Sequence, residues 1–204
     1  MDVKKDGDDY ELLVFDIETS GAFMSKNEII AIGWVFGDSI GNINEQGKVS
    51  FKFNGEFEKR CYDEFWKNNL DKLKIFEENA LPPEQAIGLF AKRIDEHEKE
   101  KKLRVISDFP GFDVAWVNYY FSKYLDRLPL HYSGFGKFRP IHDSDSYARG
   151  VMHKDYLDPW TNDEEILSRF NLDIKSKKTH LPDEDAQYIY ECHVKLINSL
   201  LITK

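Results

Sequence analysis

Two carboxylates, Asp16 and Glu18, stand two positions apart in the segment 15–19 (FDIET). Side chains two apart on a β-strand point to the same face, so a strand here would project both carboxylates together. Such neighbours repel each other unless a cation lies between them. The pair therefore suggests a divalent metal site, although Asp-x-Glu arises easily by chance in a chain with 37 acidic residues.

A second acidic position follows a predicted turn. Asp113 comes directly after the segment 109–112 (FPGF), in the first turn of a predicted helix, and Asp108 just before the turn competes for the same role. A carboxylate at a helix start is also favoured by the helix macrodipole. The position alone therefore does not separate a metal ligand from a structural residue.

The third position pairs a histidine with an acid. His180 precedes Asp185 by five residues, and Pro182 between them is typical of the first residue of a helix. His180 is therefore expected in the loop before the last helix, and Asp185 in its first turn. Asp185 shares a helical face with Ile189 and Leu196, which directs its side chain inward. On its own, His180 is equally compatible with an ordinary surface loop.

The elements that must position these residues follow from hydrophobic patterning. Apolar, β-branched runs predict strands over residues 11–17, 29–36, 49–53 and 103–107. Helices are predicted over 62–79, from Pro82 onward, and over 112–125, 163–171 and 182–201, with an irregular stretch at 126–160. Strands followed by a helix–strand–helix order favour a mixed α/β sheet. Ligands of such sheets bind at the carboxyl ends of strands, where Asp16 and Glu18 are expected.

Length and composition limit the classes of protein. With 204 residues, 41% of them hydrophobic, the chain is predicted to form a single domain over 1–204, with residues 1–10 as a flexible tail. Cys61 and Cys192 are too few for a disulfide framework. No signal peptide or membrane span is recognisable, so a soluble, cytoplasmic protein is expected. The net charge of −9 argues against a broad basic face for duplex DNA, but suits a carboxylate-rich metal site.

Taken together, these residues resemble the DEDDh exonucleases of the ribonuclease H-like superfamily, which include ribonuclease T, oligoribonuclease and proofreading exonuclease subunits. The three motifs of that family are matched by Asp16, Glu18 and Thr19, by Phe112 and Asp113, and by His180 and Asp185. The resemblance extends from Asp16 to the last helix. The segment 65–66 (FW) and the helix after it are similar to a subgroup with phage exonuclease A and bacterial exoribonucleases.

The resemblance implies an α/β ribonuclease H-like fold, a mixed five-stranded sheet flanked by helices. It also implies a 3′–5′ exonuclease that releases 5′-mononucleotides from single-stranded RNA or DNA. Two Mg²⁺ or Mn²⁺ ions would be held by Asp16, Glu18, Asp113 and Asp185, with Asp16 bridging both, and His180 would be the general base. Oxygen ligands without cysteine favour these ions over Zn²⁺.

The chain departs from the family pattern at two places. Relatives often carry His-Asn before the second motif, where this chain has Ser107 and Asp108. An apolar residue usually follows the glycine after the first motif, whereas the small Ala22 follows here. The residues predicted to contact substrate are Thr19, Phe23, Met24 and Phe109. Phe23, Met24 and Phe109 border the motifs and either stack on bases or pack in the core.

Several alternatives remain open at this point. Lys175, Lys177 and Lys178 are either a substrate-binding patch or an ordinary solvated loop. The main rival to an exonuclease is a catalytically inactive nucleic-acid-binding module on the same fold, and a third reading is a ribonuclease H-type endonuclease. The sequence does not distinguish RNA from DNA as substrate. Because some relatives are dimers, a homodimer is also open.

Overall fold

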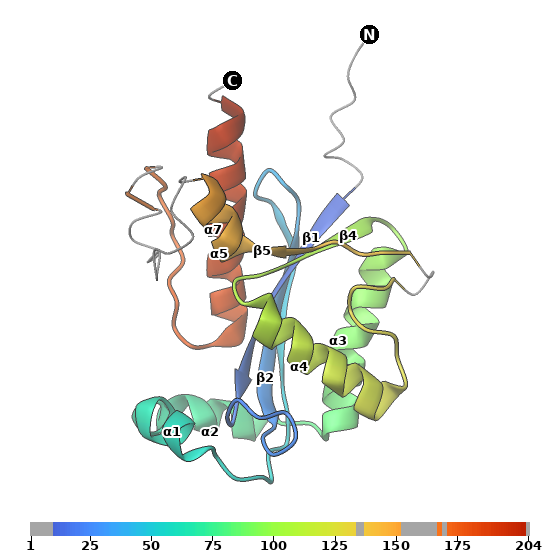
Figure 1. Cartoon of the computed structure of the whole chain (residues 1–204), viewed down its shortest axis with the longest axis vertical. Coiled ribbons are helices and arrows are strands. Elements are labelled where there is room, and N and C mark those ends of the chain that lie inside the picture. The colour runs from blue at the N-terminus through green and yellow to red at the C-terminus, as the bar shows by residue number, and fades with distance from the viewer. Residues whose placement is uncertain (1–9, 134–136, 152–166, 169–170, 203–204) are drawn as a thin grey trace.

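The computed structural model describes residues 10–133, 137–151, 167–168 and 171–202. Their strands form a five-stranded sheet with the order β3-β2-β1-β4-β5 (Figure 1). The strands are β1 Tyr10–Thr19, β2 Ile29–Gly37, β3 Ile43–Ser50, β4 Lys102–Ser107 and β5 Ile141–Asp143. β2 runs antiparallel to β1 and β3, whereas β4 runs parallel to β1 and β5. The sheet is therefore mixed, as predicted.

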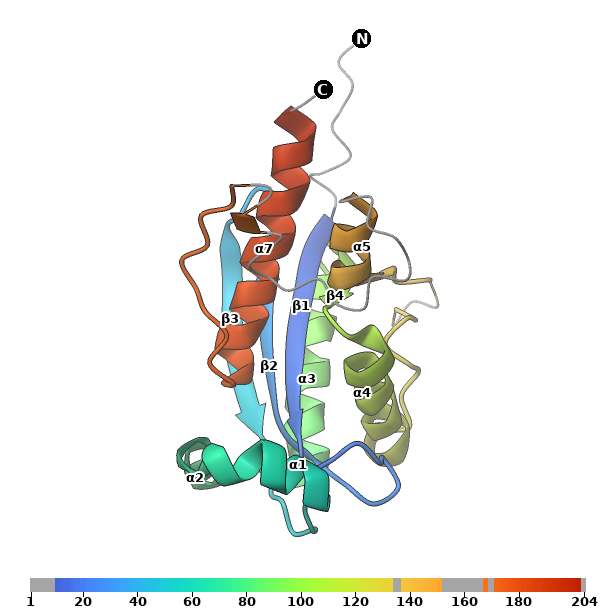
Figure 2. The same ribbon diagram turned by 60° about the vertical axis from the view of Figure 1, so that its left-hand side comes forward.

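Helices cover both faces of this sheet. They are α1 Lys59–Glu64, the short 3₁₀ segment η2 Trp66–Asn68, α2 Leu70–Glu78, α3 Pro83–Glu98, α4 Pro110–Leu125, α5 Ser144–Val151 and α7 Pro182–Ile202. α3 and α4 lie against one face and α7 against the other (Figure 2). Within the described residues, no helix is both long and apolar enough to cross a membrane.

The alternation of β1 explains these two layers. Leu13, Phe15 and Ile17 are buried in the large core beneath α3 and α4. Leu12 and Val14 are buried in a smaller core beneath α7. Because successive side chains alternate between the faces, the next two positions on the α7 face are the two predicted carboxylates.

The α1–η2–α2 segment packs beside the carboxyl end of β1, as both views show (Figures 1 and 2). Trp66 is fully buried, and its indole nitrogen donates a hydrogen bond of 2.9 Å to the backbone oxygen of Thr19. Trp66 also shares a core with Ile30, Ala31 and Phe76. This segment therefore forms a wall at the end of β1.

The prediction for the third strand is wrong, because β3 covers Ile43–Ser50 rather than residues 49–53. Asp38 accepts hydrogen bonds from the backbone nitrogens of Ile40, Gly41 and Asn42, which makes a tight connection and starts β3 early. β3 is an edge strand with mostly polar residues, so its sequence lacks the apolar signal of a strand.

The irregular stretch predicted for residues 126–160 is also wrong in part, since it contains β5 and α5. β5 has three residues and is held by parallel pairing with β4, which local patterning does not reveal. The helix predicted over 163–171 falls mainly outside the described residues, as does the predicted tail except for Tyr10, which begins β1.

Candidate active site

Asp16 and Glu18 lie near the end of β1, on the face that α7 covers. Glu18 is buried and Asp16 is half-buried. The β2 residues paired with them are small, with Gly33 opposite Asp16 and Ala31 opposite Glu18. Directly paired residues point to the same face of a sheet. The small neighbours therefore leave space beside the two carboxylates for chain from another element.

Gly33 allows the start of α7 to occupy that space. A Cβ atom built on Gly33 would lie 2.0 Å from the backbone nitrogen of Asp183 and 2.1 Å from the carbonyl carbon of Pro182. No side chain fits at such distances, so the first turn of α7 rests directly on the backbone of β2. Since Gly33 pairs with Asp16, this contact brings the residues around Pro182 to the strand carboxylates.

Asp113 reaches the same place from the first turn of α4, as predicted from the sequence. Its side chain is 4% exposed and accepts a short hydrogen bond from the hydroxyl of Ser107, the last residue of β4. The Ser107 hydroxyl oxygen also accepts a hydrogen bond from the backbone nitrogen of Phe109. The β4–α4 junction therefore holds one oxygen of Asp113 and directs the carboxylate toward β1.

The third motif folds into a small hydrogen-bonded loop. The carboxylate of Asp185 accepts hydrogen bonds from the backbone nitrogen of Thr179, at 2.6 Å, and from that of His180, at 3.0 and 3.2 Å. His180 has a φ of 61°, in the left-handed region that costs energy for a residue other than glycine. Asp185 thereby fixes the backbone that presents the His180 ring.

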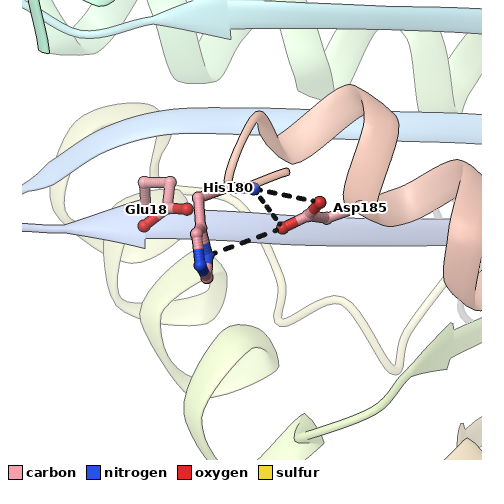
Figure 3. Close-up of side chains that lie close together, drawn as sticks. All are labelled: Glu18, His180 and Asp185. Atoms are coloured by element: carbon pink, nitrogen blue, oxygen red, sulfur yellow. Dashed lines mark hydrogen bonds and ion pairs between the residues drawn. The ribbon is translucent and has the colours of Figure 1, made fainter. Parts of the chain in front are cut away.

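The imidazole of His180 lies between the carboxylates of Glu18 and Asp185 (Figure 3). Its Nδ1 is 4.0 Å from an oxygen of Asp185, and its side chain is 51% exposed. The ring of Phe65, from the segment between α1 and η2, packs edge-on against the imidazole at a centroid distance of 4.9 Å. The imidazole is therefore supported on one side while part of it faces solvent.

The five predicted residues thus come together from β1, α4 and the α7 region. Together with Asp108, they form two groups, and within each group the donor atoms lie within 4.8 Å of one another. One group is Glu18, His180 and Asp185, and the other is Asp16, Asp108 and Asp113. Asp108, considered in the sequence only as a competitor of Asp113, joins it rather than replacing it.

Burial and mutual repulsion disfavour the charged forms of these acids. Burial raises the pKa of Asp16 well above its ordinary value, and four neighbouring carboxylates raise it further. Burial is likewise the main cause of the raised pKa of Glu18, where Lys72 opposes the shift. Burial raises the pKa of Asp113 to about 7 and also raises that of Asp185. The cluster lacks enough positive charge within the protein to stabilise all of its carboxylates.

The donor set fits hard divalent cations. Carboxylate oxygens from several elements, crowded at low exposure, are the ligands that Mg²⁺ and Mn²⁺ prefer, and neither cysteine belongs to either donor group. A bound cation would remove the repulsion that raises the pKa values of these acids. The residues present are therefore suited to hold such ions.

The residues predicted to contact substrate differ in their exposure. The Thr19 hydroxyl is buried and donates a hydrogen bond of 2.9 Å to the backbone oxygen of Gly21, so it shapes the end of β1. Phe23, Met24 and Phe109 are 56%, 36% and 64% exposed. Phe109 lies next to Asp108 at the start of α4, where an exposed ring borders the carboxylates.

Three residues near the site were assigned no role from the sequence, although Phe65 stands in the segment 65–66 that resembles a subgroup of the family. The positive charge of Lys72 in α2 acts to lower the pKa of Glu18, and the ring of Phe65 contacts that of His180. Gly33 could have been noticed, because a glycine inside an otherwise large, apolar strand indicates a close backbone approach. Neither Lys72 nor Phe65 carries such a signal, since their roles depend on how the α1–α2 segment packs.

The fold was compared with known proteins. No protein-family model and no curated protein matches the chain in sequence. Among solved structures, the nuclease domain of 3'hExo, a DEDDh family member bound to rAMP, aligns with a TM-score of 0.62 over 92% of both chains at 14% identity. S. pombe Pop2p in its Mg²⁺- and Mn²⁺-bound form aligns with a TM-score of 0.61, covering 88% of this chain and 81% of that one, at 16% identity.

The chain has the fold of the DEDDh exonucleases. The predicted α/β fold, a mixed five-stranded sheet flanked by helices, is therefore confirmed. A further neighbour in fold is E. coli Exonuclease I in complex with a dT13 oligonucleotide, with a TM-score of 0.63 and 15% identity. The alignment covers 95% of this chain but 41% of the length of Exonuclease I. At these identities, what the chain shares with the three structures is the fold.

Proposed function

We propose that the protein is a metal-dependent 3′–5′ exonuclease acting on single-stranded nucleic acid. The observation that carries this proposal is the convergence of Asp16, Glu18, Asp113 and Asp185 with His180 at the carboxyl end of β1. Structural carboxylates normally have cationic partners when they are buried. A buried group of acids beside an exposed imidazole instead suits catalysis on a phosphodiester.

The two donor groups suggest how the ions would be shared. Glu18 and Asp185 would hold one ion and Asp113 the other, with Asp16 reaching both from the middle of the cluster. When bound, such ions supply a hydroxide nucleophile and neutralise the charge that develops on the phosphate. Asp185 has a second task, because its hydrogen bonds to the 179–180 backbone fix the loop that carries the imidazole.

His180 would serve as the general base. Its half-exposed ring stands beside Glu18 and Asp185, where it can take the proton of the attacking water. The water oxygen forms the new bond to phosphorus, and the bond from phosphorus to the 3′ oxygen of the preceding nucleotide breaks. That oxygen takes a proton from solvent and leaves as a new 3′ hydroxyl, and the terminal residue is released as a 5′-mononucleotide.

The choice of a 3′ end and a single strand rests on similarity and on the exposed rings. Neighbours of the same fold include a 3'-exonuclease, a rAMP-bound nuclease and a dT13-bound exonuclease. Phe109 offers an exposed apolar ring next to Asp108, Phe23 and Met24 are exposed in the turn after β1, and stacking on such surfaces requires unpaired bases. Because the neighbours include both ribo- and deoxyribonucleotide complexes, RNA and DNA both belong in the test.

Digestion of matched oligonucleotides tests the proposal. Single-stranded RNA and DNA, labelled at the 5′ end, are incubated with the protein and Mg²⁺ or Mn²⁺, and again with excess chelator. A descending ladder that requires the metal is expected. Immediate release of the label as a mononucleotide would contradict the direction, and activity that survives exhaustive chelation would contradict the metal mechanism.

A closed circular substrate completes the test. A 3′–5′ exonuclease needs a free end, so a single-stranded circle should stay intact while the linear form of the same sequence is degraded. Cutting of the circle would indicate a ribonuclease H-type endonuclease instead. Binding of the linear strand without any cleavage would indicate an inactive nucleic-acid-binding module.

A further inference from the structure

Asp108 lies outside the five residues to which the proposed reaction assigns a role. It connects the end of β4 to the start of α4, and its carboxylate belongs to the group that includes Asp16 and Asp113, with donor atoms within 4.8 Å of one another. Its side chain is 28% exposed. Asp108 therefore stands at the mouth of the site, with Asp113 deeper inside.

Asp108 has a lysine as its ion-pair partner. The Nζ atom of Lys178 lies 2.9 Å from one of its oxygens. Lys178 comes two residues before His180, so this ion pair joins the β4–α4 junction to the loop that leads into α7. The ammonium therefore sits at the border of the carboxylate cluster, where a metal ion held by Asp16 and Asp113 would also be expected.

Without Asp108, few carboxylate oxygens on this side of the cluster are available to bind a cation. One oxygen of Asp113 accepts a hydrogen bond from the Ser107 hydroxyl. In the proposed arrangement, Asp16 also reaches the ion held by Glu18 and Asp185. A divalent ion prefers six oxygen ligands and keeps waters where the protein supplies few. A third carboxylate at this distance would hold the ion more firmly than two.

We propose that Asp108 is an additional ligand of the ion held by Asp16 and Asp113, and that Lys178 is the resident cation which this ion displaces. The inference rests on the proposed function, because it concerns the same metal site. Lys178 suits the task, since a lysine ammonium is a compact charge on a flexible stem and can leave a carboxylate without disturbing the backbone. A divalent ion carries twice its charge and outcompetes it.

Calorimetric titration of the protein with Mn²⁺, in the absence of nucleic acid, tests the inference. Asp108→Asn keeps the shape of the side chain and removes the charge, so the affinity for one ion should fall at least about 10-fold, as it does for groups that only orient metal ligands. Lys178→Met removes the competitor and keeps an unbranched stem, so the same affinity should rise. In the double variant, Lys178→Met should bring little gain, because its partner carboxylate is gone.

Two control variants separate these effects from a general change of charge. Lys177→Met removes a lysine next to Lys178 that lines a cleft with Glu184 and Gln187 instead. Asp71→Asn removes an exposed acid in the first turn of α2. Both controls should leave Mn²⁺ affinity within about 2-fold of the wild type, because exposed charges are screened by salt. Thermal melts of each metal-free variant establish that it is folded.

The outcomes distinguish this inference from the exonuclease proposal. If Asp108→Asn binds Mn²⁺ as well as Asp71→Asn does, Asp108 is not a ligand. If Lys178→Met gains no more affinity than Lys177→Met, no displacement occurs. A wild-type protein that shows the Asp108 dependence yet digests no oligonucleotide would overturn the proposed function alone. A wild-type protein that binds no Mn²⁺ would overturn both.

Discussion

Buried carboxylates lie near both ends of β1, but their surroundings are opposite. Near the start of the strand, Glu11 is 3% exposed, and its oxygens contact His97 Nδ1 at 2.8 Å and Asn44 Nδ2 at 2.7 Å. Glu45 of β3 contacts the other ring nitrogen of His97 at 3.1 Å and forms a tight ion pair with Arg93. These four charged side chains, Glu11, Glu45, Arg93 and His97, form what we call the α3 ion cluster.

The pKa values express the difference between the two regions. In the α3 ion cluster, the hydrogen bond from Arg93 is the main cause that lowers the pKa of Glu45 to about 2. At the other end of the strand, burial raises the pKa of Asp113 to about 7, and that of Asp16 also lies well above its ordinary value. The first region is therefore complete within the protein, whereas the second is stabilised by protonation or by added cations.

The comparison shows how a structural cluster differs from a functional one on the same strand. His97 stacks on Phe36 with ring centroids 3.7 Å apart and presents both of its nitrogens to carboxylates, so no part of its ring can take a proton from a substrate. His180 touches Phe65 edge-on and keeps half of its side chain exposed. The difference predicts that substitutions at the two ends affect different measurements.

The largest effect is expected for Asp16→Asn. The variant should lose at least about 10⁴-fold in kcat, the upper range for a general base, since Asp16 reaches both ions in the proposed arrangement. Its metal-free form should melt at a higher temperature, because a buried acid with a raised pKa is removed. Glu45→Gln is the matched substitution in the α3 ion cluster. It should retain kcat and melt lower, and a metal-free Asp16→Asn protein that melts below the wild type would refute the contrast.

The two histidines give the next largest difference. His180→Ala should lower kcat by about 10²–10⁴-fold while metal binding and folding stability are kept. His97→Ala should keep kcat but lose about 1–3 kcal/mol of folding free energy, because it leaves the buried Glu11 without one of its hydrogen-bond partners. Steady-state kinetics and urea unfolding of both variants provide the test. A crippled His97→Ala enzyme beside an active His180→Ala enzyme would remove His180 from the mechanism.

Much of this fold was predictable because local patterns and tertiary structure agree. The run around Phe15 is apolar on both faces, as a central strand requires. The prolines at 82–83 and at 182 mark helix starts. The bounds of β3 were predicted wrongly, because an edge strand needs no apolar residues. β5 was missed, because a strand of three residues forms only by pairing with its neighbour. These elements are defined by pairing with β2 and β4.

The candidate site was predictable to the extent that its residues lie in motifs. Asp16, Glu18, Asp113, His180 and Asp185 have spacings that could be compared with a family, and the structure brings them together. Their roles in catalysis remain predictions. The contributions of Phe65 and Lys72 arise from packing of the α1–α2 segment, and no spacing in the sequence relates that segment to His180 or Glu18.

Gly33 offers a test of how the site is assembled. Gly33→Ala should force the first turn of α7 away from β2, since the new Cβ would lie 2.0 Å from the backbone of Asp183. Overpacking of this kind costs about 1–3 kcal/mol, and a shift of about 1 Å in the His180 loop can cost ~10²-fold in kcat. Gly88→Ala in α3 is the control. Its nearest neighbour would be 3.9 Å away, so it should keep kcat and gain about 0.5–1 kcal/mol.

The smallest predicted effect is the pH dependence of the metal-free protein, which the two regions influence in opposite directions. The folded-state pKa of Asp113, about 7, exceeds its ordinary value of 3.8. Folding then favours the protonated acid, and this stability is present below pH 3.8 and lost as pH rises through about 7. The pKa of Glu45 is lowered from 4.5 to about 2, so its contribution is present above pH 4.5 and lost as pH falls through about 2.

The Asp113 contribution should therefore raise the melting temperature of the metal-free protein at pH 5 relative to pH 8, by about 2–4 °C for each kcal/mol of stability lost between them. The buried His193, whose pKa is lowered to about 4, contributes in the opposite direction. Asp113→Asn should therefore lower the melting temperature at pH 5 relative to that at pH 8, and Glu45→Gln should not. Saturating Mg²⁺ should act in the same direction as Asp113→Asn, since a bound cation stabilises the ionised carboxylates at pH 8. Melting curves in chelator at both pH values decide the matter, and an unchanged difference between them in Asp113→Asn would show that the pH dependence has its origin outside the candidate site.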